Sequence, residues 1–275
     1  MNPPEDAERD IFDRRLIGIR RARAERRASR SFLLERVADD AVERICDINR
    51  QFDQCLITGL PMVREMVVSG LPDNKRPARI DEISNTGDPE APLKHYDLVV
   101  SLLSLHAVNS MFETLTHIRK ILKPDGHFIG ALFGGETLNE LRRACYALDN
   151  IRLGGVTPRV YPFANHLQMA PLLQNAGFAL PVIDRDRVSV SYAGMKTLVN
   201  DLRDLGETNS LAMRDRRYLG RNYLAGFEAL ASEDKFGTTF DIFWMTGWAP
   251  HESQQKPLEP GSAQVSLARI FKANS

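Results

Sequence analysis

Apolar residues along this chain alternate between two spacings, one typical of strands and one of helices. Tyr96–Leu103 is a nearly continuous apolar run, as expected of a parallel strand that is buried on both faces. Met111–Leu122 has apolar residues at helical spacing, and Pro124-Asp125-Gly126 predicts a stop and a tight turn. His127–Phe133 is a second strand and Thr137–Leu148 a second helix. This alternation predicts an α/β architecture with a mostly parallel sheet.

The segments on either side extend the same architecture. Residues 1–50 have a helical pattern, Cys55–Thr58 is a short buried strand, Pro61–Val68 is a helix and Ala78–Ile83 is a weak strand. Downstream, the spacing predicts three helices and two strands: helices over Ala164–Ala176, Met195–Leu205 and Arg214–Ala231, and strands over Val182–Tyr192 and Phe240–Met245. If these two strands pair, they give the sheet an antiparallel edge, and the helices between them form a small lobe over it.

Composition is that of an ordinary globular protein, with 43% hydrophobic and 26% charged residues. Lys+Arg and Asp+Glu are both 36, so the global charge favours no polyanionic partner such as nucleic acid. Cys46, Cys55 and Cys145 have no CxxC spacing, which indicates neither a disulfide framework nor a metal site and fits a reducing cytoplasm. No apolar run approaches the length of a membrane span, so we expect no transmembrane segment.

The charge is nevertheless uneven along the chain. Between Arg14 and Arg30 lie eight arginines and a single acid, Glu25. One interpretation is a solvated helix face, and the other is a docking surface for an acidic protein or an anionic membrane. The sequence leaves both open.

Candidate chemical groups follow the predicted strands. Ser101 to Asn109 comes after a buried strand, at the carboxyl edge where open α/β sheets bind ligands. His106 in this segment is a candidate general base, although a histidine after a strand also commonly caps or packs. Asp81 and Glu82 follow the weak strand and could accept hydrogen bonds from a ribose or an adenine, or could be a solvated loop pair.

Several segments together resemble a known family. They are IFDRRL at Ile11–Leu16, DLVVSLLSLHAVN at Asp97–Asn109, IRKILKPDGHFIGALFGGETLNELR at Ile118–Arg142, PRVYPFAN at Pro158–Asn165, LLQNAGFALPV at Leu172–Val182, LVNDLRDLGETNSL at Leu198–Leu211 and GWAPHESQQKPLEPGSA at Gly247–Ala263. They resemble the class I S-adenosylmethionine-dependent methyltransferases, within them the subgroup of mitochondrial complex I assembly factor 5, an arginine hydroxylase, and its alphaproteobacterial relatives. The malonyl-acyl-carrier-protein methyltransferases are a more distant likeness.

The resemblance implies a Rossmann-like domain and a cofactor site. It divides the chain into an arginine-rich helical segment at 1–50, a methyltransferase-like domain at 51–246 with a helical insertion at about 193–235, and a polar tail at 247–275. It places S-adenosylmethionine against a small set of residues: Gly59, Asp81, Glu82, Ser101 and Leu103. His106 is the one weak candidate for catalysis.

The chain departs from the family in the loop that should hold the cofactor. The expected D-x-G-x-x-x-G falls on Ile57–Val63, where only Gly59 matches. A side chain at Val63 would block close backbone approach, and the acid that binds the ribose has no clear equivalent. Losing charge-assisted hydrogen bonds to the ribose forfeits on the order of 1.5–3 kcal/mol. We therefore expect cofactor binding to be weakened at least ten- to a hundredfold.

Three functions follow from these observations. The first is a methyltransferase-like protein related to complex I assembly factors, with weak or lost activity because the cofactor loop is degenerate. The second is a non-catalytic assembly factor that binds a protein partner such as a complex I subunit, with peripheral membrane contact possible. The third is a malonyl-acyl-carrier-protein O-methyltransferase whose arginines face an acidic carrier.

Overall fold

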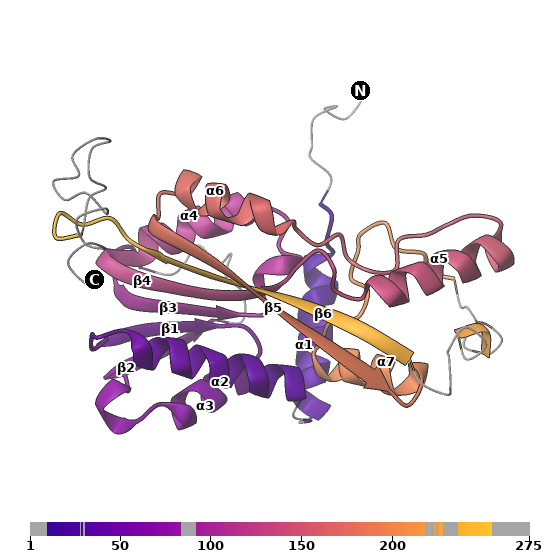
Figure 1. Ribbon diagram of the computed structural model, residues 1–275, viewed down its shortest axis with the longest axis horizontal. Helices are drawn as coiled ribbons and strands as arrows, with labels where there is room; N and C mark the ends of the chain where they lie inside the picture. The colour runs from indigo at the N-terminus through magenta and orange to yellow at the C-terminus, as the bar shows by residue number, and fades with distance from the viewer. Residues whose placement is uncertain are drawn as a thin grey trace, which may run out of the picture.

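The computed structural model describes residues 10–254 except 28, 30, 84–91, 218–219, 221–222, 224 and 228–235. At its centre is a six-stranded sheet with the order β2-β1-β3-β4-β6-β5 (Figure 1). The strands are β1 (Gln54–Thr58), β2 (Arg79–Ile83), β3 (Tyr96–Leu102), β4 (Leu122–Phe133), β5 (Ala179–Tyr192) and β6 (Phe236–Trp248). The first four run parallel, β6 is antiparallel to β4, and β5 is antiparallel to β6. This is the Rossmann-like sheet with an antiparallel edge that the sequence predicts.

Helices cover both faces of the sheet. They are α1 (Arg14–Arg27), α2 (Phe32–Asp47), α3 (Pro61–Gly70), α4 (Met111–Ile121), α5 (Asn139–Leu153), α6 (His166–Asn175) and α7 (Met195–Asp204), with short 3-10 turns η1 (Asp73–Lys75) and η2 (Leu105–Ala107). Figure 1 shows α2 and α3 on one side of the sheet and α4 and α6 on the other. α1, α5 and α7 gather beyond the carboxyl ends of the parallel strands. The helical pattern predicted for residues 1–50 is confirmed in α1 and α2.

Two hydrophobic clusters hold these layers together, one on each face. Along β3, Leu98 and Val100 pack into the cluster under α2 and α3, whereas Val99 packs into the cluster under α4 and α6. Successive side chains of a strand point to opposite faces, so a continuous apolar run is what a strand covered on both faces requires. All residues of β3 are buried, which explains why the sequence has a continuous apolar run there.

The structure corrects one predicted turn. Pro124-Asp125-Gly126 lies inside β4 as an irregularity, because the pairing with β3 shifts register between Tyr96–Leu122 and Leu98–His127. Asp125 has a left-handed φ of 60°. Two backbone hydrogen bonds join this segment to Ala249, after β6: Asp125 N–H donates to Ala249 O (3.1 Å) and Ala249 N–H donates to Gly126 O (2.8 Å). The pairing with the start of the tail thus keeps the segment extended.

The helix predicted over Arg214–Ala231 lies partly outside the described residues. Of the residues that are described, 214–217 are not helical, whereas 220, 223 and 225–227 are helical. Within the described part of the chain, no helix is both long enough and apolar enough to cross a membrane.

Candidate functional site

Gly59 ends β1 at the carboxyl edge of the sheet, where the sequence predicts the cofactor loop. Its φ is 137°, a conformation that side chains rarely adopt. A Cβ at this position would lie 2.6 Å from the carbonyl oxygen of Leu102 at the end of β3. The close approach of the two strand ends therefore requires glycine here independently of any ligand.

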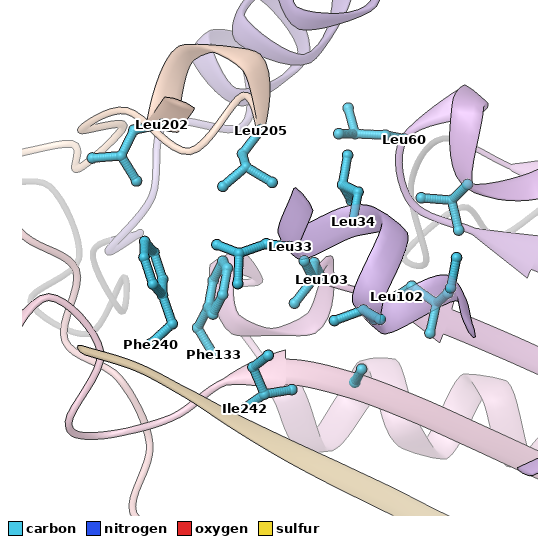
Figure 2. Close-up of a cluster of buried hydrophobic side chains, with 14 of the residues drawn as sticks. Leu33, Leu34, Leu60, Leu102, Leu103, Phe133, Leu202, Leu205, Phe240 and Ile242 are labelled. Atoms are coloured by element: carbon cyan, nitrogen blue, oxygen red, sulfur yellow. The ribbon is translucent and has the colours of Figure 1, made fainter. Parts of the chain in front are cut away.

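Leucines that follow β1 and β3 at this edge of the sheet are buried in the hydrophobic core. Leu60 and Leu103, which follow β1 and β3, are only 7% and 6% exposed and belong to the same buried cluster as Leu34 of α2 and Leu205. Figure 2 shows Leu34, Leu60, Leu103 and Leu205 around the start of α2. Leu103 holds a left-handed φ of 49°, unusual for a residue with a branched apolar side chain. The residues that follow β1 and β3, where the sequence predicts the cofactor site, are therefore part of the hydrophobic core.

Asp81 and Glu82 lie within β2 and do not follow it, so the predicted loop position is wrong. Because they are neighbours in a strand, their side chains point to opposite faces. Asp81 accepts a hydrogen bond from the Tyr96 hydroxyl (3.1 Å) and pairs with Arg79 (3.1 Å). Glu82 lies 3.8 Å from the guanidinium of Arg64 in α3. The two carboxylates therefore do not act together. Asp81 already contacts Tyr96 and Arg79, and Glu82 already faces Arg64.

Ser101 is buried near the end of β3, beside Thr58 of β1. Its hydroxyl is 2.8 Å from that of Ser104. The Thr58 hydroxyl is also buried and has no hydrogen-bond partner among the described residues. The structure thus brings Gly59, Ser101 and Leu103 to one edge of the sheet, as predicted.

His106 lies in η2, just after β3, and is 4% exposed. Its Nε2 is 2.8 Å from a carboxylate oxygen of Glu207, which lies after α7. Arg21 of α1 approaches the other oxygen of Glu207 at 3.8 Å. Burial alone would raise the pKa of Glu207, but the charges and hydrogen bond of His106 and Arg21 outweigh it and lower the pKa. His106 Nδ1 is buried without a hydrogen-bond partner among the described residues.

A cavity of about 170 Å³ adjoins Glu207. Its wall is mainly apolar and is built from the ends of β4 and β6, the start of α5, α7 and the segment 159–163. Aromatic side chains account for much of the wall: Phe133, Tyr161, Phe163 and Phe240. The Tyr161 hydroxyl donates to Thr208 O (2.9 Å), and burial raises the pKa of Tyr161 to about 12. Tyr161 is therefore protonated and acts as a hydrogen-bond donor at neutral pH.

Arg159 lines the same cavity and is held by a fully buried carboxylate. Its guanidinium forms a bidentate pair with Asp149 of α5 (2.8 Å), which also accepts from the hydroxyls of Thr157 (2.8 Å) and Tyr223 (2.6 Å). Asp149 has 0% exposure. Burial alone would raise its pKa, but the hydrogen bonds and charge of Arg159 and the two hydroxyls lower it.

Sequence reasoning missed this cluster of Glu207, Tyr161, Asp149 and Arg159. Asp149 and Arg159 are ordinary charged residues when read locally, and Glu207 stands in a predicted break between helices. The available signal was the family resemblance, because its matching segments contain Arg159, Tyr161 and Glu207. Within the described residues, no group of three or more histidine, cysteine or carboxylate side chains is placed to hold a metal ion.

Comparison with known proteins agrees with this architecture. The model of the methyltransferase domain family matches residues 15–181. The human mitochondrial arginine-hydroxylase NDUFAF5 is 34% identical over 293 residues, covering 97% of this chain and 85% of the human protein. The Danio rerio protein of that name is 34% identical over 265 residues, covering 88% and 82%. A malonyl-[acyl-carrier protein] O-methyltransferase from Nitrosospira multiformis is 29% identical over 228 residues, covering 79% and 71%. The chain belongs to the methyltransferase domain family and, within it, to the family of the arginine-hydroxylase NDUFAF5.

Proposed function

We propose that this protein is a methyltransferase-fold assembly factor for respiratory complex I that acts by binding a protein partner and has lost effective S-adenosylmethionine binding. The observation that carries the proposal is the burial of Leu60 and Leu103, which directly follow β1 and β3, in one cluster with Leu34 and Leu205. A nucleoside cofactor at this edge would have to displace that cluster. Removing one buried leucine from a packed core typically costs about 2–5 kcal/mol.

The polar groups at the same edge support the proposal. Each oxygen of Asp81 already accepts a hydrogen bond, one from Tyr96 and one from Arg79, so a ribose hydroxyl would have to share this carboxylate with them. Glu82 faces Arg64 on the outer side of α3. The donor and acceptor set therefore does not fit S-adenosylmethionine. The distant likeness to methyltransferases acting on malonyl-acyl-carrier protein is the competing proposal, and it requires a working cofactor site.

Calorimetric titration of the full chain with S-adenosylmethionine tests the loss of cofactor binding. The Nitrosospira multiformis relative, titrated in parallel, is the positive control. We expect no binding heat from this chain at concentrations that saturate the control. Micromolar binding by this chain would refute the proposal.

The assembly role is tested by deleting the gene in its source organism and measuring complex I on native gels. We expect less assembled complex I, restored by the wild-type gene. Normal complex I would refute the role, and biotin auxotrophy would favour the carrier-protein alternative. Mass spectrometry of complex I subunits from the deletion strain then asks whether an arginine loses one added oxygen, the modification that the relatives' name describes. Such a loss would mean that the protein is an enzyme.

The compartment belongs to the same proposal. The names of the relatives include the word mitochondrial. The cysteines of this chain, Cys46, Cys55 and Cys145, are free thiols, which fits a reducing compartment, and we propose the cytoplasm.

A further inference from the structure

α1 has one buried face and one strongly basic exposed face. Ile17, Arg21 and Ala24 are buried, and the helix lies against α7 (Figure 1). The exposed residues on the opposite side include Arg15, Ile19, Arg23 and Arg26, which follow one another at three- or four-residue steps and so share a face. The buried side fixes the helix to the domain, and its arginines therefore project from a rigid support.

A second segment, distant in sequence, adds to this surface. Ala212 N–H donates to Ile11 O (2.9 Å), and Arg214 pairs with Asp13 (3.2 Å) just before α1. The Leu16 N–H, with the charges of Arg214 and Arg216, lowers the pKa of Asp13. Arg216, two residues beyond Arg214, is exposed. We define the basic patch as eight exposed residues of these two segments: Ile11, Arg14, Arg15, Ile19, Arg23, Arg26, Met213 and Arg216.

The arginines of the patch have no ion-pair partner among the described residues. Arg14, Arg15 and Arg23 form no ion pair with any residue in the described ranges. Elsewhere on the surface, Arg36 and Arg44 of α2 pair with Asp186 and Asp184 of β5 at 2.9 and 2.8 Å. Among the described residues of the two segments, the exposed acids are Asp10 and Glu25. A local excess of positive charge on a neutral chain is therefore available to a partner.

We propose that the basic patch binds a carboxylate-rich surface of a protein partner. Arginine guanidinium groups match carboxylates in planar, bidentate geometry, and arginine beside exposed apolar side chains is typical of protein interfaces. Ile19, Ile11 and Met213, which are 39%, 49% and 72% exposed, supply those apolar contacts. The proposal rests on the partner-binding function and names the charge of the partner.

Two features argue for a protein over other anionic partners. An interfacial membrane helix needs a broad exposed apolar face, but the apolar side of α1 is turned into the domain and only Ile19 stands among its exposed arginines. Single-stranded nucleic acids are usually held by aromatic side chains that stack on bases, and the patch contains none. Carboxylates therefore fit the patch best.

Charge reversal tests this inference. The triple variant Arg15→Glu, Arg23→Glu and Arg26→Glu is compared with a control carrying the same charge change at exposed arginines elsewhere: Arg143→Glu, Arg152→Glu and Arg187→Glu. A fluorescein-labelled poly-L-glutamate peptide is the probe, and fluorescence anisotropy is measured at about 50 mM and about 300 mM salt. We expect the patch variant to bind at least about tenfold more weakly at low salt, and the control to change by less than about threefold. Equal loss in both variants overturns the inference, as does tighter binding of the wild type to phosphatidylserine vesicles or to single-stranded DNA.

The same two variants are then returned to the deletion strain. We expect the control, but not the patch variant, to restore complex I on native gels. If the deletion leaves complex I intact, the proposed function fails. If the deletion impairs complex I and the patch variant restores it fully, only the inference about the patch fails. Circular dichroism and thermal unfolding of both purified variants exclude loss of folding as the cause.

Discussion

His106 and Glu207 lie 101 residues apart in the sequence, and their side chains meet at 2.8 Å in the interior. The contact joins the end of β3 to the segment after α7, and Arg21 adds α1 to the same carboxylate. Three parts of the chain therefore depend on one buried charge. If the buried carboxylate loses its charge, the positive charge of its partners stays buried without an opposite charge beside it. The resulting loss of folding stability is usually larger than the net contribution of the intact pair.

We expect Glu207→Gln to lower the free energy of unfolding at pH 7 by about 3 kcal/mol. The pKa of Glu207 is lowered below the 4.5 of a free glutamate, so its stabilisation is complete above that pH and is lost as the pH falls through the folded-state pKa. Urea unfolding at pH 7 and at a series of lower values measures both effects. The stability gap between wild type and variant should narrow below pH 4.5. The exposed Glu65→Gln is the control, and an equal effect there would contradict the prediction.

Two Asp–Arg pairs of the same chemistry should differ in their contribution to stability. Asp149 is fully buried against Arg159, whereas the Asp184 side chain is 50% exposed beside Arg44. We expect Asp149→Asn to cost about 3–5 kcal/mol and Asp184→Asn less than about 1 kcal/mol. Guanidinium unfolding at neutral pH measures both. Comparable losses would mean that burial does not set the strength of these pairs.

Leu103 combines a buried side chain with a left-handed backbone, and these two properties can be separated. Leu103→Ala and Leu103→Gly should each lower the free energy of unfolding by roughly 2–4 kcal/mol, because both remove the same packing. The glycine variant should be the more stable of the two by about 1 kcal/mol, since φ is 49°. Leu148, buried inside α5, is the matched control, and there the glycine variant should be less stable than alanine by about 1 kcal/mol. The same order at both positions would contradict the assigned backbone conformation.

Much of this fold could be predicted because local patterns determine it. The continuous apolar run at Tyr96–Leu103 predicts β3, and the aromatic strand near Phe240 together with the alternating strand before it predicts the antiparallel edge. Contacts that depend on packing between distant segments could not be predicted in this way. Nothing in the residues around His106 indicates that Glu207 will face it. The tight turn predicted at Asp125 became part of β4 because of hydrogen bonds to Ala249, more than a hundred residues later.

The candidate site, too, could be predicted only where neighbouring residues in the sequence determine it. The sequence placed Gly59, Ser101 and Leu103 at the carboxyl edge, since residues that follow parallel strands meet there. It predicted a weakened cofactor loop from the missing glycines. It did not predict that leucines from α2 and the segment after α7 would join Leu60 and Leu103 in one buried cluster, because those side chains come from separate elements.

His127 offers a pH-dependent test at the opposite end of β4. Its ring is 4% exposed and packs 4.2 Å from the ring of Trp248. Burial, with a smaller contribution from the charge of Arg50, lowers its pKa from 6.5 to about 4. Because the folded state binds the proton more weakly than the unfolded chain, the stability from neutral His127 is complete above pH 6.5 and is lost as the pH falls toward 4.

We expect His127→Phe, which keeps an aromatic ring beside Trp248, to remove this dependence. Between about pH 7 and pH 4.5 the wild type should lose roughly 2–3 kcal/mol more stability than the variant. Thermal or urea unfolding across this range measures the difference. His251→Gln, at an exposed histidine, should follow the wild-type curve. If His127→Phe also parallels the wild type, protonation of another group governs the loss of stability, and His127 is not the buried neutral base that its surroundings indicate.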